Sequence, residues 1–423
     1  MPTLTRSVLA SLLAVALSQA LPALGADADA DALDLQSAPQ ASADAAPGTR
    51  FFIEGALGSA DQRYQSDNQN LARGSFDLNY SARLGAGWQG VFSDRLDVVS
   101  TTESGISSPV NSLREAYLSW QPDGGDKLVE LGRVNLRYGP GYGYNPTDFF
   151  RDGSLRIQTT VNPFEKRENR LGTIMLRGQA LWTDGSLSVA YSPKLADDPS
   201  SNGWSADLGA TNNVNRGLVA LSTKLTERVS TQLLAYQVQG SSPALGASAT
   251  ALLSDAAVAY AEFTRSSEPS LLSRALGLQD PKESANRFTG GLTYTTDGKL
   301  SVTAEYQYNG FALNAANLAA LGATPSIEQA YLLTAQNLQE LASREAYMIY
   351  VTQKDLGLKG LDLTAFVRVN AGDHSRLGWL ELRQHWSRFD MALSYSQASG
   401  NASSEYGVFP YSRVLQLLGS YFF

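Results

Sequence analysis

The amino-acid sequence predicts an all-β chain, a transmembrane antiparallel β-barrel of about 18 strands, with 16 as the alternative count. Three observations lead to this class. Apolar and polar residues alternate over long stretches, and the last strand-like segment ends on an aromatic residue, Phe423. No run of about 18 apolar residues, the length a membrane-spanning helix needs, follows the N-terminal segment.

The clearest alternation covers residues 75–89, SFDLNYSARLGAGWQ, where Phe76, Tyr80 and Trp88 fall on one face with Leu and Ala. Asp, Asn, Ser and Arg residues occupy the other face, which gives the two-residue period of a β-strand. The apolar face has Tyr and Trp toward its ends, as the lipid-facing surface of a transmembrane barrel has aromatic residues at both membrane interfaces. Because only a closed sheet satisfies every backbone group in lipid, the pattern predicts a barrel rather than a soluble sandwich.

Eight tight connections fit the short turns that such barrels place on the periplasmic side. They lie near Ser93-Asp94, Asp123-Gly124-Gly125, Asp184-Gly185, Thr226-Glu227, Ser254-Asp255, Asp297-Gly298, Leu356-Gly357 and Ser387-Arg388. Eight hairpins, a first strand from Phe51 and a last strand to Phe423 give 18 strands. The arm at residues 247–252 before Ser254 is short, and without that hairpin the count is 16.

Three long outer loops are expected at residues 63–74, 105–109 and 139–172, and a fourth at 312–343. The last of these contains SIEQAYLLTAQNLQELAS, whose apolar residues have roughly helical spacing. We expect a short surface helix there, capped by Ser326, with a packing role.

The N-terminal residues separate into two segments that precede the barrel. Residues 1–25 contain one cation, Arg6, an apolar run and small residues, which predicts a secretory signal peptide. Residues 26–50 are acidic and poor in large apolar side chains, so we expect a disordered periplasmic segment. Residues 51–423 form the predicted barrel.

Charge and residue usage limit the chemistry that the chain can perform. The formal net charge is −8, or −9 without Arg6, which argues against nucleic acid as a partner. The chain has no Cys, so disulfides and thiolate metal sites are excluded, and we predict no cofactor and no metal. Only two His residues occur, His374 and His385, and no nucleophile or metal motif accompanies them. The sequence therefore does not predict an enzyme.

Strand parity places a set of charged and aromatic residues in the lumen or on the third loop. One strand, KLVELGRVNLRY, changes phase, and a bulge near Leu131-Gly132 would point Arg133, Asn135 and Arg137 inward. The predicted pore-lining or solute-binding residues are Arg83, Glu115, Arg133, Asn135, Arg137, Tyr142, Tyr144, Asp148, Arg151, Arg177, Arg368 and Arg383. Two interpretations of these charges stay open. In the first, they create a transverse electric field that orients solutes; in the second, they pair with one another and only keep the lumen hydrated.

The third predicted loop begins with RYGPGYGYNPTDFFR, in which three Gly allow unusual backbone conformations and two Pro stiffen the path. It continues with five basic residues between 151 and 170. A long third loop, rigid at its root and then basic, resembles the inward-folded loop of general and substrate-specific porins. The stretch also resembles a motif of large outer-membrane channels, matched here by Gly132, Arg133, Tyr138, Gly139, Gly141, Tyr142, Asn145, Pro146 and Asp148. The shorter YGPGY core is similar to a turn of capsule-attachment barrels.

The C-terminal SRVLQLLGSYFF resembles the last strand of Gram-negative outer-membrane proteins, whose terminal Phe serves as an assembly signal. These resemblances imply a cell outer-membrane location, with lipid and, through Phe423, the barrel-assembly machinery as partners. They imply a porin-like channel for passive diffusion of small polar solutes, anionic ones included, with the solute itself unknown. The alternative is a non-conducting barrel that binds or exports surface polysaccharide. The sequence leaves the oligomeric state open, a homo-oligomer included.

Overall fold

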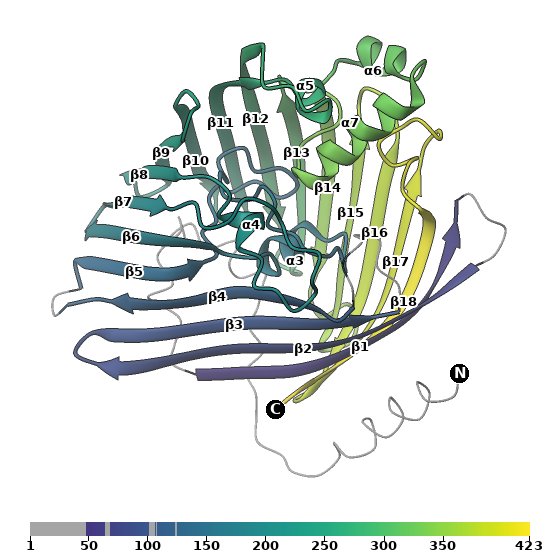
Figure 1. Cartoon of the computed structure of the whole chain (residues 1–423). Helices are drawn as coiled ribbons and strands as arrows, with labels where there is room; N and C mark the ends of the chain where they lie inside the picture. Colours follow the sequence, from purple (N-terminus) through teal and green to yellow (C-terminus); the bar gives the residue numbers. More distant parts are fainter. Residues whose placement is uncertain (1–47, 64–67, 101–105, 107, 123–124) are drawn as a thin grey trace.

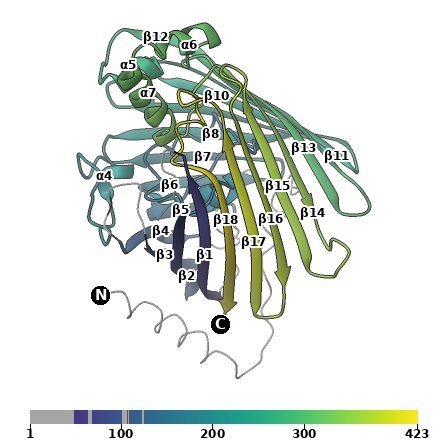
Figure 2. The same ribbon diagram turned by 90° about the vertical axis from the view of Figure 1, so that its right-hand side faces the viewer.

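The computed structural model describes residues 48–63, 68–100, 106, 108–122 and 125–423. Over these residues the chain forms one antiparallel sheet of 18 strands, in which β1 pairs with both β2 and β18. The sheet therefore closes on itself (Figures 1 and 2). This confirms the predicted barrel and the higher of the two strand counts.

The strands follow one another around the wall in sequence order. They are β1 (Gly48–Gln62), β2 (Asn68–Gly85), β3 (Trp88–Val99), β4 (Val110–Trp120), β5 (Lys127–Val134), β6 (Thr173–Trp182), β7 (Gly185–Ser192), β8 (Arg216–Thr226), β9 (Val229–Val238), β10 (Ala244–Ser254), β11 (Ala257–Pro269), β12 (Lys282–Thr295), β13 (Leu300–Asn309), β14 (Glu345–Gln353), β15 (Leu361–Asn370), β16 (Arg376–His385), β17 (Phe389–Ser399) and β18 (Tyr411–Phe422).

The alternation of the sequence becomes the two faces of this wall. On β6, Leu176 is 51 % exposed on the outside, whereas its neighbours Met175 and Arg177 are buried inside the barrel. At the seam, Phe423 donates its backbone N–H to the Phe51 oxygen at 3.1 Å, and the two rings lie 5.0 Å apart. The aromatic C-terminus therefore helps to join the last strand to the first.

Six of the eight predicted tight connections lie between consecutive strands of the described barrel, and one prediction is wrong. Of the remaining connection, Asp123-Gly124-Gly125, residues 123 and 124 lie outside the described residues. Ser93 and Asp94 lie within β3, and the turn between β2 and β3 is at Gly85, Ala86 and Gly87, which have φ of 89°, 51° and 79°. The polar Ser-Asp pair resembles a turn, but it belongs to the polar alternation of the lumenal face. The two glycines provide the left-handed backbone that the turn requires.

Two further details of the wall differ from expectation. β10 is a full strand of 11 residues, so the doubtful hairpin around Ser254 exists. The pairing of β5 with β4 and β6 runs without a register shift, so the predicted bulge in β5 is wrong. The shift occurs instead between β3 and β4, where Ser93 pairs with Glu115 and Asp94 pairs with Leu113. Arg114 is the extra residue of that bulge.

Helices occur in the long connections of the described chain. They are α3 (Pro163–Glu168), α4 (Leu208–Thr211), α5 (Leu271–Ala275), α6 (Ala315–Leu321) and α7 (Pro325–Asn337). The helix α7 confirms the predicted surface helix, although Thr324 is its N-cap and Ser326 lies in the first turn. Figures 1 and 2 show α5, α6 and α7 gathered at one end of the barrel, where Tyr331 and Leu332 of α7 pack against Leu271 and Leu318. The expected packing role is thus seen.

Within the described part of the chain, none of the helices has both the length and the apolar character needed to cross a membrane. The predicted signal peptide and residues 26–47 of the predicted acidic segment lie outside the described residues. Residues 48–50, which were assigned to that segment, form the start of β1.

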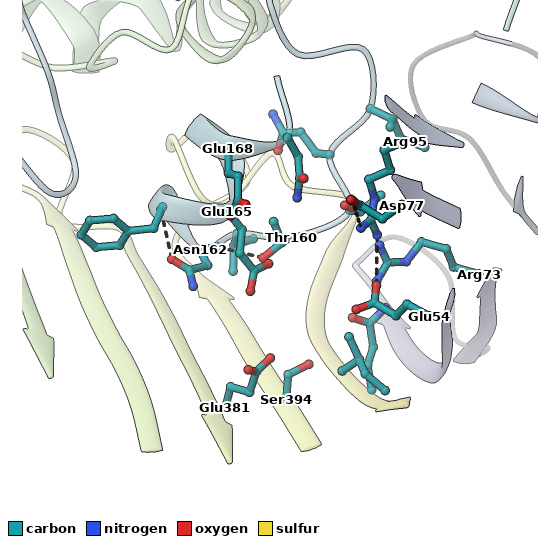
Figure 3. Close-up of a pocket in the computed structure, with 18 of the residues that line it drawn as sticks. Glu54, Arg73, Asp77, Arg95, Thr160, Asn162, Glu165, Glu168, Glu381 and Ser394 are labelled. Atoms are coloured by element: carbon teal, nitrogen blue, oxygen red, sulfur yellow. Dashed lines mark hydrogen bonds and ion pairs between the residues drawn. The ribbon is translucent and has the colours of Figure 1, made fainter. Parts of the chain in front are cut away.

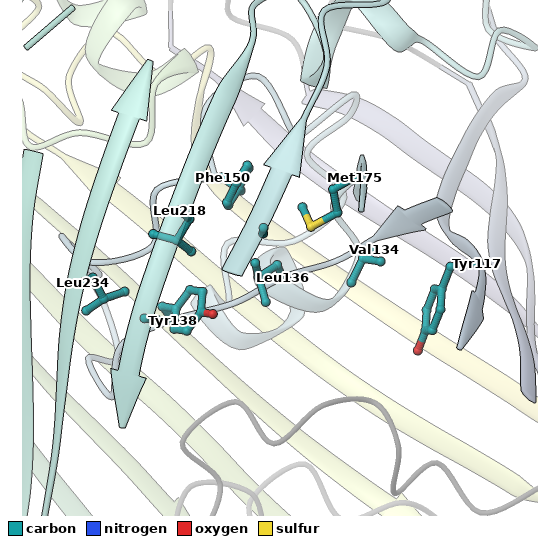
Figure 4. Packing of buried hydrophobic residues seen from close by; sticks show 10 residues of the cluster. Tyr117, Val134, Leu136, Tyr138, Phe150, Met175, Leu218 and Leu234 are labelled. Carbon is teal, nitrogen blue, oxygen red and sulfur yellow. The ribbon is translucent and has the colours of Figure 1, made fainter. Parts of the chain in front are cut away.

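The connection between β5 and β6, residues 135–172, is here called loop 3, and it enters the barrel (Figure 1). Its first residues Leu136 and Tyr138 pack with Phe150 against the inner faces of β6, β8 and β9, through Met175, Leu218 and Leu234 (Figure 4). On this side, loop 3 covers apolar side chains of the inner wall together with buried polar ones such as Arg177 and Glu130. Loop 3 therefore fills one side of the lumen and leaves the other side open.

Candidate functional site

Two carboxylates of the inner wall hold the glycine-rich root of loop 3. The Glu262 carboxylate on β11 accepts hydrogen bonds from Gly141 N–H at 2.6 Å and from the Thr147 hydroxyl at 2.7 Å. Glu305 on β13 accepts from Tyr142 N–H at 2.6 Å and Gly143 N–H at 2.9 Å. Both glutamates are buried, and these donors replace the water that their charges would otherwise require.

The spacing of the glycines follows from this contact. A Cβ at position 141 would lie 2.8 Å from Glu262 Oε1 and 2.5 Å from the Tyr144 carbonyl oxygen. At Gly139 the backbone also has φ of 87°, and a Cβ would meet the same carboxylate. The Gly-x-Gly pattern is therefore needed for a close approach between backbone and wall.

Further ion pairs fix the rest of loop 3. Asp148 accepts from Arg170 at 2.8 and 3.0 Å, within the loop itself. Arg151 pairs at 2.6 Å with Glu340, which follows α7, and the Tyr144 hydroxyl donates to the same carboxylate at 2.6 Å. Burial and the Glu340 charge raise the pKa of the Tyr144 phenol, so this hydroxyl remains a donor at neutral pH. Loop 3 is thus held to the wall and to the segment that carries α7.

Beside loop 3 lies a cavity of about 2030 Å³, here called the channel. Its lining includes Lys299, Asp355 and Arg388 at the short turns and Leu333 and Asn337 of α7 at the opposite end of the barrel. The channel therefore reaches from one end of the barrel to the other. Its wall is formed mainly by β1 to β4 and β15 to β18, which are adjacent across the β1–β18 seam.

One side of the channel carries a network of arginines and carboxylates on β1 to β4. Arg95 lies 3.0 Å from Glu54, 3.3 Å from Asp77 and 3.2 Å from Asp97. Two further ion pairs extend the network, Arg73 with Glu54 at 2.7 Å and Arg114 with Asp77 at 2.6 Å. Figure 3 shows Glu54, Arg73, Asp77 and Arg95 side by side on this wall.

The helix α3 of loop 3 carries acidic side chains on the opposite side of the channel. Figure 3 shows Glu165 directed toward Glu381 and Ser394 of the facing wall. Burial and the Glu381 carboxylate raise the pKa of Glu165 to about 7, against the lowering effect of Arg383 and of a hydrogen bond with Thr160. Glu381 is itself paired with Arg383 at 2.8 Å. Glu165 is therefore a carboxyl group in the lining of the channel that ionises near neutral pH.

The channel is nearly neutral in charge and partly aromatic. Among the described residues its lining contains nine basic and nine acidic side chains, with His385 counted as neutral. An apolar strip formed by Tyr350, Leu377, Trp379, Phe164 and Phe409 lines it as well. A solute in the channel therefore meets charged groups of both signs and flat apolar surface.

The predicted site residues divide into three groups in the structure. Arg383 lines the channel. A second, smaller cavity of about 130 Å³ on the other side of α3 has five of them in its lining: Tyr142, Tyr144, Asp148, Arg151 and Arg368. The remaining six line neither cavity: Arg83, Glu115, Arg133, Asn135, Arg137 and Arg177.

The contacts of this third group are structural. Arg83 is exposed at the end of β2, beside the turn to β3, and Arg137 is exposed on loop 3. The buried Arg133 donates to the Leu113 carbonyl at 3.2 Å, and Arg177 pairs with Glu130 at 2.9 Å. Asn135 is held at both ends. Its N–H donates to Glu115 at 3.3 Å, and its side-chain oxygen accepts from Arg170 at 2.8 Å.

Sequence reasoning missed Arg73, Arg95 and Arg114, the arginines that face the channel. Arg73 was placed in an outer loop, and Arg95 was placed at the turn that was expected at Ser93-Asp94. A turn placed at the glycines of residues 85–87 would have put both arginines on the lumenal face with Asp77. Arg114 and Glu115 are consecutive residues, and in a regular strand they would point to opposite faces of the wall. Arg114 points inward together with Glu115 only because of the bulge on β4.

Over the described residues, no group of three or more acidic or His side chains is arranged to hold a metal ion. No protein-family model matches the chain, and no curated protein matches it in sequence. Solved structures do match it in fold. OccAB4 of Acinetobacter baumannii has a TM-score of 0.56 at 9% identity, covering 89% of this chain and 97% of that chain.

A BenF-like porin from Pseudomonas fluorescens has a TM-score of 0.57 at 11% identity, over 88% of this chain and 97% of that chain. OccK8 (OprE) of Pseudomonas aeruginosa has a TM-score of 0.53 at 14% identity, over 89% and 97%. At such identities the likeness shows the fold alone. The chain therefore shares the closed antiparallel barrel of these porin-like outer-membrane channels.

Proposed function

We propose that the chain is a channel of the outer membrane of a Gram-negative bacterium, through which small polar solutes diffuse passively. The observation that carries this proposal is the 2030 Å³ cavity, whose lining includes residues at both ends of the barrel. Loop 3 narrows the lumen without filling it, since its root is held against the wall by Glu262 and Glu305. The fold it shares with porins supports the same function.

The charges of the channel, equal in number for the two signs, favour dipolar solutes such as zwitterions. Arg73, Arg95 and Arg114 lie on one side, and Glu165 and Glu168 of α3 lie on the other. The arginines are paired with Glu54, Asp77 and Asp97 on the same wall, so a zwitterion finds hydrogen-bond partners for both of its charges there. The flat surfaces of Tyr350 and Trp379 add apolar contact for the body of such a solute.

Planar bilayer recording of the purified, refolded protein tests this proposal. We expect discrete conductance steps, and swelling of protein-loaded liposomes in small zwitterions that stops for larger solutes. Folded protein that inserts into bilayers without any conductance step would contradict it. Such a result is what a non-conducting polysaccharide-binding barrel would give, and no contact described above favours that alternative. We assign no enzymatic reaction to the chain.

A further inference from the structure

The short helix α3 separates two compartments of opposite charge. Glu165 and Glu168 line the channel, whereas Lys166 and Arg167 line the second cavity. This division follows from the helical period, which places residues three apart on one face and the two residues between them on the other. The sequence PFEKRE thus presents acid to the channel and base to the space behind loop 3.

The second cavity lies directly beside the channel. It has a volume of about 130 Å³ and is enclosed by loop 3, the segment after α7 and the inner faces of β14 and β15. Six residues line both spaces, namely Leu155, Gln158, Val161, Gln336, Leu377 and Phe409. The two spaces therefore adjoin at these side chains as well as across α3.

The charge balance of the two spaces differs. The channel has nine basic and nine acidic side chains, whereas the second cavity has five basic and three acidic ones among the described residues. Two of its arginines are neutralised, Arg170 by Asp148 at 2.8 Å and Arg151 by Glu340 at 2.6 Å. Arg167 donates to the backbone oxygen of Tyr138 at 3.0 Å.

Lys166 and Arg368 remain, with a single carboxylate, Glu405, which accepts a hydrogen bond from Asn370 at 2.7 Å. The Lys166 ammonium has no hydrogen bond or ion pair within the described residues. The Nε atom of Arg368 is buried and has no hydrogen-bond partner among them. Burial and the Arg368 charge lower the pKa of Lys166 to about 8. Lys166 thus faces the small cavity without an anionic partner among the described residues, whereas Arg368 is attracted by Glu405 and Glu305 but forms no ion pair with either of them.

We propose that the second cavity is an oxyanion-binding subsite beside the channel, in which Lys166 and Arg368 hold the carboxylate or phosphate group of a small solute. A guanidinium offers paired N–H donors that match an oxyanion, and an ammonium adds a compact charge. The volume equals roughly four water molecules at about 30 Å³ each, which suits a group of acetate or phosphate size. The channel acts only as the route by which the solute arrives, so the subsite depends on the proposed function for access alone.

Isothermal titration of the full-length refolded protein with inorganic phosphate, and separately with acetate, tests the subsite. We expect saturable binding of at least one of the two anions, with one site per chain. Lys166→Gln and Arg368→Gln should each weaken it by about tenfold or more, because each removes a charge-assisted hydrogen bond. The anion that binds more tightly identifies the head group.

Lys194→Gln is the matched control, because it removes the same charge from an exposed lysine that lines neither cavity and pairs with Asp197. We expect it to bind anions as the wild-type protein does. Glu405→Gln removes the competing carboxylate and should strengthen binding by threefold or more. If Arg368→Gln does not fold, Lys166→Gln and Glu405→Gln still decide the result through their opposite effects.

The inference is overturned if neither anion binds saturably to folded wild-type protein, or if Lys166→Gln binds as tightly as the Lys194→Gln control. Conductance is recorded on the same preparations. Protein that conducts but binds neither anion would contradict the proposed subsite and support the proposed channel. Protein that binds an anion through Lys166 but does not conduct would support the proposed subsite and contradict the proposed channel.

Discussion

The carboxylate of Glu262 on β11 accepts the backbone N–H of Gly141 at 2.6 Å, across 121 residues of sequence. Glu262 also accepts from the Thr147 N–H at 3.2 Å and from the Asn145 amide at 3.1 Å. A buried carboxylate with this many donors is fixed in place, and so is the loop that supplies them. The width of the channel therefore depends on a glutamate that does not line it.

Glu262→Gln should loosen loop 3. The Gln side chain presents an NH₂ group to backbone donors, which leaves buried N–H groups unsatisfied at about 1–3 kcal/mol each. We expect larger and noisier conductance steps than in the wild-type channel, with the barrel itself still folded. Single-channel recording measures this change, and steps of wild-type size and noise would show that the loop is held by other contacts.

Gly141→Ala tests the same contact from the side of the loop. The added methyl group would lie 2.8 Å from Glu262 Oε1, so the loop must move, at roughly 1–3 kcal/mol. Gly178→Ala is the matched control, because a Cβ there has no atom within 4 Å. We expect altered conductance for Gly141→Ala alone, and an equal effect of both substitutions would contradict the proposed cause.

Arg95→Met should destabilise the barrel and make the channel more selective for cations. Arg95 is 5 % exposed and contacts Glu54, Asp77 and Asp97, whose charges would then exceed those of Arg73 and Arg114. Removing one partner of a buried ion network costs about 3–5 kcal/mol. Urea unfolding of the barrel and reversal potentials in a salt gradient measure the two effects.

Arg413→Met serves as the control for this substitution. Its ion pair with Asp61 is 2.8 Å long, but the two side chains are 60% and 35% exposed. An exposed pair of this kind contributes about 1 kcal/mol or less. A loss of stability equal to that of Arg95→Met would show that burial of the network is not the cause.

Ion selectivity should change with pH because of Glu165. Its pKa is raised to about 7, so the group is mostly protonated at about pH 6 and mostly ionised at about pH 8. Cation preference should therefore rise with pH across this range. Since the folded pKa lies above its ordinary value of 4.5, the stability that the protonated Glu165 contributes to the packing of loop 3 is lost as the pH rises through about 7.

Reversal potentials of the wild-type protein and Glu165→Gln at several pH values measure this effect. Lys166 also titrates nearby, with a pKa lowered to about 8, so the difference between the two proteins isolates Glu165. A pH profile that is the same in both proteins would assign the dependence to another group.

The strand pattern was predictable from the sequence because the lipid and lumenal faces impose a strict two-residue period. Six of the eight turns followed from local turn residues, and the one at Ser93-Asp94 failed because a polar Ser-Asp pair on the lumenal face resembles a turn. The bulge on β4 has no local signal of its own, since its position depends on the pairing with β3. With Glu115 taken as inward, parity alone leaves Arg114 off the lumenal face.

The candidate site was less predictable, because loop 3 decides which part of the lumen stays open. Arg177 does point inward, as parity indicates, but it lies on the side that loop 3 covers and pairs there with Glu130. In the sequence, Glu262 and Glu305 look like any other acidic residue on the lumenal face of a later strand. Their role depends on contact with a loop more than 100 residues away, and no local pattern encodes it.

Modification of a single engineered cysteine tests the channel most directly, because the natural chain has no Cys. Ser394 lines the channel opposite Glu165, whereas Ser188 faces inward on the side that loop 3 covers, where it contacts Arg177 at 3.0 Å. A charged thiol reagent should reduce the conductance of Ser394→Cys in steps and leave that of Ser188→Cys unchanged. Conductance of Ser394→Cys that persists unaltered after complete labelling would contradict a channel that passes between α3 and β17.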